Sequence, residues 1–100
     1  MYGTIAKINI HPNKLDELHD LAQRMDAAPG HLARYVYRMD ANPNELWLIA
    51  IFESRDAYWK NADSPEQHQR YLELRALLSN EPEWHDGEII DVWPQNGAPA

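Results

Sequence analysis

The sequence contains no cysteine, so neither a disulfide framework nor a thiolate metal site can form. Basic residues are few: nine stand against sixteen acidic residues, and the formal net charge is −7. This balance opposes phosphate backbones and anionic membrane surfaces, so we expect no nucleic-acid partner and no membrane partner. The chain also lacks an apolar run long enough to span a membrane and an N-terminal targeting pattern. A cytoplasmic protein is therefore expected.

Several motifs of common catalytic sites are missing as well. There is no glycine-rich phosphate loop and no G-x-S-x-G element. Asp16, His19 and Asp20 lie within one predicted helical turn, and His85 precedes Asp86, but neither group has the convergent spacing of a metal site. A solvated acidic face explains the first group. We expect no bound metal.

What the chain does contain is a regular series of apolar patterns. One hundred residues suit one domain with a single modest core, which we place at residues 1–94, with a flexible Gly/Pro/Ala tail at 95–100. Alternating and helical spacings predict, in chain order, strands at 2–10, 31–40, 45–53 and 88–93, and helices at 13–27, 55–61 and 65–79. Residues 84–87 are expected to be a connector. Ser54 and Ser64 are suitable N-caps, and Ser64 is followed by Pro65 and by Gln67 in capping-box spacing.

This order is that of an α+β fold with a ferredoxin-like β-α-β-β-α-β sheet. Right-handed crossovers place the helices on one face and leave the other face bare. The strand at 45–53 is nevertheless apolar on both sides, with Leu46, Leu48, Ala50 and Phe52 on one and Trp47, Ile49 and Ile51 on the other. Exposed apolar sheet of this extent normally marks an interface. We therefore expect a homodimer in which two open sheet faces pack together.

Two stretches carry a resemblance to a known family. Residues 8–18, INIHPNKLDEL, place a proline before an acidic, leucine-bearing helix, and residues 46–72, LWLIAIFESRDAYWKNADSPEQHQRYL, join an apolar strand to two helical pieces. Together with the hairpin between them, they resemble the antibiotic biosynthesis monooxygenase family over about residues 1–93. The resemblance implies a dimeric α+β barrel.

The resemblance also implies a chemistry. Monooxygenases of this family use no metal, flavin or haem, and oxidise phenolic or quinol substrates with molecular oxygen. Such a reaction needs an apolar cavity and a polar group that deprotonates or orients the phenol. We expect the cavity between sheet and helices, with His68 or Asn61 handling the proton. The residues that would shape it for a small aromatic ligand are Tyr35, Tyr37, Trp47, Tyr71 and Trp84.

Each of these residues also has a purely structural interpretation. His68 and Tyr71 share a helix face. His68 can equally be a solvent-exposed histidine, and Tyr71 can equally be a core aromatic residue. Asn61 can cap a helix, and Tyr35 and Tyr37 can be packing residues of the sheet.

The sequence departs from the family pattern in two respects. Many family members carry histidine where this chain has Asn61, and the positions that form the site of the haem-degrading branch hold Ala6, Asn61 and Tyr71 here. Two other functions stay open: a non-catalytic, ligand-binding or stress-related barrel, and a lactone-type isomerase.

Overall fold

The structure is a computed structural model that describes residues 1–25 and 28–94. The tail predicted at 95–100 lies outside this range. In chain order the elements are β1 (Tyr2–Asn9), α1 (Leu15–Arg24), β2 (His31–Arg38), β3 (Glu45–Phe52), α2 (Arg55–Ala62), α3 (Pro65–Arg75) and β4 (Glu83–Glu88). The strands form one antiparallel sheet in the order β2-β3-β1-β4. The predicted ferredoxin-like α+β arrangement is confirmed.

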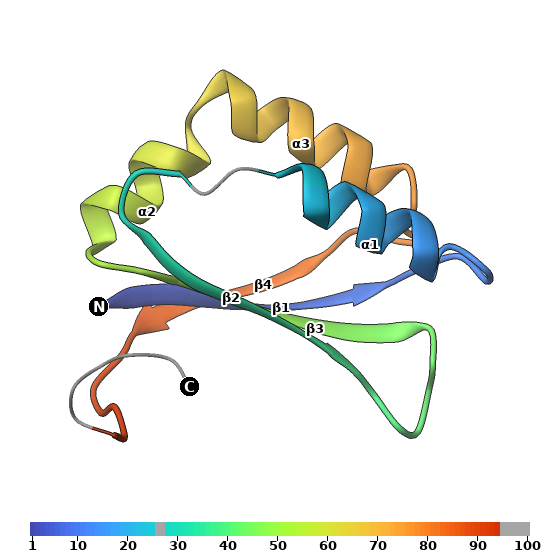
Figure 1. Cartoon of the computed structure of the whole chain (residues 1–100), viewed down its shortest axis with the longest axis horizontal. Helices are drawn as coiled ribbons and strands as arrows, with labels where there is room; N and C mark the ends of the chain where they lie inside the picture. Colours follow the sequence, from blue (N-terminus) through green and yellow to red (C-terminus); the bar gives the residue numbers. More distant parts are fainter. Residues whose placement is uncertain (26–27, 95–100) are drawn as a thin grey trace.

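The helices form one layer over one face of the sheet (Figure 1). No helix covers the opposite face within the described residues, and the chain after β4 turns toward that side (Figure 1). We call the first face the helix side and the second the open side. Strand alternation assigns each side chain to one of them.

The fourth strand was predicted at the wrong place. It runs over Glu83–Glu88, which includes the expected connector, and not over residues 88–93. Its register with β1 pairs Glu88 with Tyr2, and one further bond joins the Ile89 N–H to the Met1 carbonyl. The pairing of β4 with β1 ends at this point. The apolar residues that suggested a strand therefore lie past the sheet, with Ile90 and Trp93 89% and 90% exposed.

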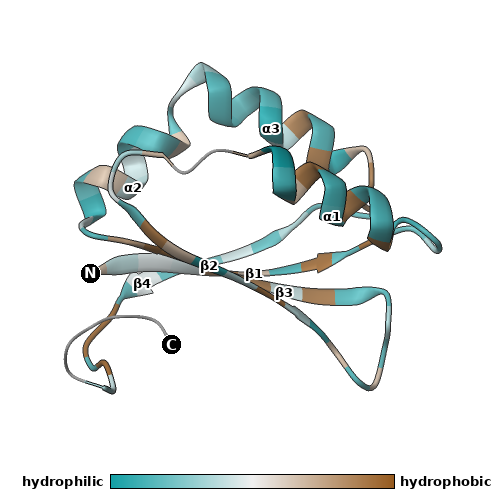
Figure 2. Ribbon diagram, viewed as in Figure 1, coloured by the Kyte–Doolittle hydropathy of each residue, from teal (hydrophilic) through white to brown (hydrophobic). Residues whose placement is uncertain are grey.

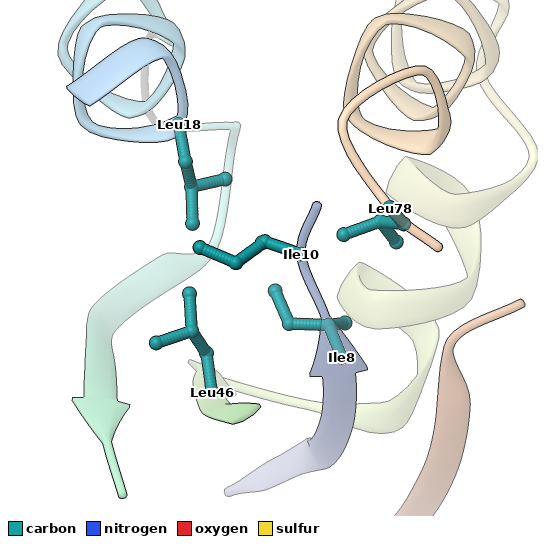
Figure 3. Packing of buried hydrophobic residues seen from close by; sticks show 5 residues of the cluster. All are labelled: Ile8, Ile10, Leu18, Leu46 and Leu78. Carbon is teal, nitrogen blue, oxygen red and sulfur yellow. The ribbon is translucent and has the colours of Figure 1, made fainter. Parts of the chain in front are cut away.

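The core lies on the helix side, at the end of the sheet covered by α1 and the segment after α3. Five buried side chains meet there: Ile8, Ile10, Leu18, Leu46 and Leu78 (Figure 3). An isolated bridge pairs Ile10 with Leu78, so the loop after α3 is tied to the end of β1. Burial of aliphatic side chains from both helix and sheet holds the two layers together.

Both serine caps are confirmed. The Ser54 hydroxyl accepts a hydrogen bond from the Ala57 N–H, and the Ser64 hydroxyl accepts one from the Gln67 N–H. Each bond satisfies an N–H that has no partner inside its helix. The return bond of a capping box is not formed: the Ser64 N–H donates to the Asn61 carbonyl instead. Asn61 thus lies where the chain turns from α2 into α3.

The open side of the sheet is apolar, as the strand pattern predicted. Ile5 pairs with Ile49, and Gly3 with Ile51, while Tyr35 lies beside Ile49 from the other neighbour. Ile5 is 47% exposed. Figure 2 shows hydrophobic positions along the strands, whereas the helical ribbons are largely hydrophilic.

The packing of the core allows us to predict how truncating one of its residues changes the free energy of unfolding. Leu78, 1% exposed, lies in the cluster of Figure 3, whereas Leu72 on α3 is 49% exposed. Truncating Leu78→Ala leaves a cavity and should lower the free energy of unfolding by about 2–5 kcal/mol. The matched variant Leu72→Ala should cost less than about 1 kcal/mol. Urea unfolding followed by circular dichroism measures both, and equal losses would contradict the described core.

Candidate functional site

A cavity of about 410 Å³ lies between the helix side of the sheet and the helices. All four strands contribute to its lining, as do α2 and α3. Its volume falls within the range of small-molecule sites, roughly 300–1,000 Å³. Aromatic rings make up much of the wall, from Phe52, Tyr58, Trp59, Tyr71 and Trp84. The cavity therefore suits a small, flat, largely apolar ligand.

The structure brings together some of the residues singled out from the sequence. Asn61, His68, Tyr71 and Trp84 all line this cavity. They come from the end of α2, two successive turns of α3, and β4. Segments far apart in the sequence thus meet around one space. The roles of these residues remain predictions.

The three remaining candidates lie elsewhere. Tyr35 and Tyr37 pair with Ile49 and Trp47, and these four positions belong to the open side. Tyr35, Tyr37 and Trp47 consequently do not reach the cavity under the helices. Because side chains alternate along β2, its tyrosines and its arginines face opposite sides of the sheet. The arginines face the helix side, and Arg34 lines the cavity.

The Asn61 side chain has both a structural role and a place in the wall. Its amide Nδ2 donates to Gln67 Oε1 at 3.5 Å, and its backbone carbonyl accepts from the Ser64 hydroxyl at 2.8 Å. Gln67 lines the cavity too. The long amide–amide distance indicates a weak bond, which a ligand can replace at small cost.

His68 and Tyr71 differ in the surroundings of their polar groups. The Tyr71 hydroxyl donates to Glu81, which also accepts from Arg75 Nε at 3.0 Å. That hydrogen bond to Glu81 raises the pKa of Tyr71 and lowers the pKa of Glu81. Tyr71 therefore offers its ring to the cavity, while its hydroxyl is engaged outside. The His68 side chain is exposed at the first turn of α3.

Sequence reasoning missed a polar pair at the cavity. Tyr58 of α2 donates from its hydroxyl to Asp86 Oδ1 of β4 at 2.8 Å. Burial, and then this bond, raise the pKa of Tyr58 well above its usual range. Thr4 lies beside them in the wall; it is 4% exposed, and its hydroxyl has no hydrogen-bond partner among the described residues. The alternation of β1 does place Thr4 on the buried side, but nothing in the sequence shows that the hydroxyl lacks a partner.

His31 was also missed. It begins β2, lines the cavity, and stacks on Phe52 with ring centroids 4.6 Å apart. Its Nε2 lies 3.0 Å from the Ala33 carbonyl, so Nε2 carries the hydrogen and Nδ1 is left as an acceptor. Burial, the main cause, lowers the pKa of His31; the bond to Ala33 opposes this, and the charges of Arg34 and Arg70 support it. The cavity thus contains a neutral imidazole that can accept a proton.

A second cavity, of about 600 Å³, lies on the open side. Its walls are the apolar strand residues, including Ile5, Tyr35 and Ile49, and the segment from His85 to Pro94. It contains no residue of the described helices, and Thr4, Ala50 and Asp86 line both cavities.

In residues 1–25 and 28–94 no three His, Cys, Asp or Glu side chains are arranged to hold a metal ion. No helix in the same part of the chain is long and apolar enough to cross a membrane.

The family model for antibiotic biosynthesis monooxygenases matches residues 1–74. The chain therefore belongs to that family, and the resemblance seen in its sequence is confirmed. No curated protein matches the chain.

Solved structures agree on the fold. SnoaB from Streptomyces nogalater, a cofactor-independent oxygenase, has a TM-score of 0.80 at 18% identity, over 94% of this chain and 97% of its own. Rv0793 from Mycobacterium tuberculosis gives 0.75 at 21% identity, over 92% and 97%. A conserved protein from Methanosarcina mazei gives 0.73 at 18% identity, over 86% and 89%. At these identities the likeness shows the fold alone.

The half-buried Tyr58 leads to a prediction of how stability depends on pH. An unfolded tyrosine ionises near pH 10, whereas the raised pKa keeps Tyr58 protonated in the folded chain. The stability that Tyr58 contributes is therefore present below about pH 10 and is lost as the pH rises further. Between pH 9 and pH 11 the wild-type free energy of unfolding should fall more than that of Tyr58→Phe. Tyr37→Phe, at an exposed tyrosine, should behave as wild type in the same urea titrations, and parallel curves for all three proteins would contradict the prediction.

Proposed function

We propose that this chain is a cofactor-independent monooxygenase that oxidises a small phenol or hydroquinone with molecular oxygen in the cavity under the helices. The observation that carries the proposal is the aromatic wall of this 410 Å³ cavity together with the imidazole and amide groups along it. Membership of the family supports the proposal. So does the activity named for SnoaB, which shares the fold.

The proposed oxidation needs few catalytic groups from the protein. Removing a proton from the phenol gives an electron-rich anion that can reduce oxygen directly. In an anthrone-like substrate the reacting CH₂ group becomes a carbonyl; O₂ supplies that oxygen atom, and its second atom leaves in one molecule of water. Four electrons pass from the substrate to O₂, so the balance needs no other reductant. The protein has to exclude bulk water, orient the ring and hold one proton.

The residues at the cavity divide these tasks. His68 or Asn61 handles the phenol proton, and the neutral His31 gives the cavity a second imidazole. The rings of Tyr71 and Trp84 shape the wall. Tyr35, Tyr37 and Trp47, on the open side, have no part in this mechanism within one protomer.

Oxygen uptake tests the proposal. Hydroquinones and anthrone-like phenols should be consumed faster with the protein than in buffer. His68→Ala should lower kcat by about 10²–10⁴ if the imidazole takes up the phenol proton. Asn61→Ala should lower kcat if the amide orients the phenol by a hydrogen bond, because an amide is not a base. His19→Ala, at an exposed histidine on α1, is the matched control and should be as active as wild type. Oxygen uptake that is no faster than in the buffer blank for every substrate would contradict the proposal.

The polar contacts of the cavity favour one alternative. The Tyr58 and Tyr71 hydroxyls are both engaged with carboxylates, Asp86 and Glu81. Polar groups that hydrogen-bond to one another, and not to a substrate, are expected in a non-catalytic, ligand-binding or stress-related barrel. In that case aromatic ligands raise the melting temperature without oxygen uptake. The lactone-type isomerase differs from both in converting its substrate under anaerobic conditions.

We also propose that two copies pack through their open sheet faces. The apolar residues on that side and the exposed Ile90 and Trp93 beside it support this homodimer. Light scattering at micromolar concentration should give about twice the chain mass of 11.6 kDa. Ile5→Glu, at the centre of the open side, should shift the mass to that of one chain, whereas Leu72→Glu on the outer surface of α3 should not. A wild-type monomer would contradict the dimer.

A further inference from the structure

Two arginines reach the cavity under the helices from different elements. Arg34 stands on β2 opposite Ala50, and Arg70 stands on α3; all three residues line the cavity. The positive charges of both arginines lower the pKa of His31. Two guanidinium groups therefore act on the same region of the cavity, close to the start of β2.

Neither guanidinium forms an ion pair with a carboxylate of the described residues. Arg34 donates from Nη2 to the Ala22 carbonyl at 3.1 Å and from Nη1 to Met25 Sδ at 4.0 Å, which leaves three of its five N–H groups free of protein partners within that part of the chain. Asp86 is the one acidic residue in the described lining, and it accepts from Tyr58. Among the residues that the structure describes, no carboxylate of the wall neutralises the arginine charges.

This positive region contrasts with the chain as a whole, whose net charge is −7. Arg70 is half-buried and has lost part of its hydration, and a carboxylate restores more of it than a neutral group can. Arg34 is exposed, and its N–H groups that lack a described partner can bind the same carboxylate. Guanidinium and carboxylate also match in shape, since the planar fork of donors accepts both oxygens at once. A lining that holds both aromatic side chains and two cations suits a ligand that combines an aromatic ring with a negative charge.

We infer that the cavity takes an aromatic carboxylate, whose ring lies against the tryptophan and tyrosine walls and whose charge is bound by Arg34 and Arg70. This inference rests on the proposed function in that it names the class of substrate for the same cavity. It adds that the phenol or hydroquinone carries an acid group. The acid anchors the ring, so that the reacting carbon is held in a fixed position.

The experiment compares two probes of nearly equal size, 2-naphthoate and the neutral 2-naphthalenemethanol, by isothermal titration calorimetry at pH 7. Wild type should bind the acid at least about tenfold more tightly than the alcohol, the gain typical of one hydrogen bond to a charged group. In Arg34→Gln and in Arg70→Gln this ratio should fall, and in the double variant it should be close to one. Raising the salt concentration should weaken binding of the acid and leave the alcohol unchanged.

Arg38→Gln is the matched control. Arg38 lies on the same strand and the same side as Arg34, four residues along, at about 13 Å, and it does not line the cavity. Its variant removes the same charge and should keep the wild-type ratio. Arg70→Gln changes a helix position outside the Arg34 contacts with Ala22 and Met25, so it tests the inference even if Arg34→Gln fails to fold.

Equal wild-type affinity for acid and alcohol, no binding of either probe, or a preference that persists in the double variant would overturn the inference. Because binding is measured without turnover, its outcome is separate from that of the oxygen-uptake assay. If the protein prefers the acid but consumes no oxygen, the proposed monooxygenase activity is refuted and the proposed carboxylate-binding site is supported.

Discussion

The rest of the structure depends on the position of β1 at the middle of the sheet. Its backbone pairs with β3 on one side and with β4 on the other, and its side chains alternate between the buried helix side and the open side. Gly3 fits so closely against the β3 backbone that a Cβ there would collide with the Ala50 carbonyl oxygen. Thr4, one residue later, is the buried polar group of the cavity wall. One strand thus fixes the sheet, the core and one wall of the site.

Much of the fold could be predicted because its signals are local. The strand that spans Glu45–Phe52, the hairpin before it and the serine caps of α2 and α3 each have a distinct pattern of residues. The fourth strand could not be found in this way. EWHDGE pairs within the sheet with β1 alone, at an edge where its side chains are exposed, and it has no hydrophobic alternation. The apolar residues after it suggested a strand because hydropathy alone does not show where backbone pairing stops.

The candidate site was predictable in part, for a related reason. Asn61, His68 and Tyr71 are assigned to the cavity by the break between α2 and α3 and by helical spacing, which sequence shows well. Which side of β2 faces the helices is decided by its register with β3, and so Arg34, rather than Tyr35, lines the cavity. The pairing of Tyr58 with Asp86 joins residues 28 positions apart and depends on tertiary structure alone. An acidic chain thereby encloses a positively charged, aromatic cavity that its composition does not suggest.

The central claim is that an aromatic ligand binds under the helices and not on the open side, where the second cavity is larger. Amide chemical-shift mapping by NMR during titration with 2-naphthoate tests it most directly. The account predicts the largest changes at Asn61, His68 and Arg70, together with the indole N–H of Trp84. Changes concentrated instead at Ile5, Ile49 and Val92, which line the open-side cavity, would contradict it.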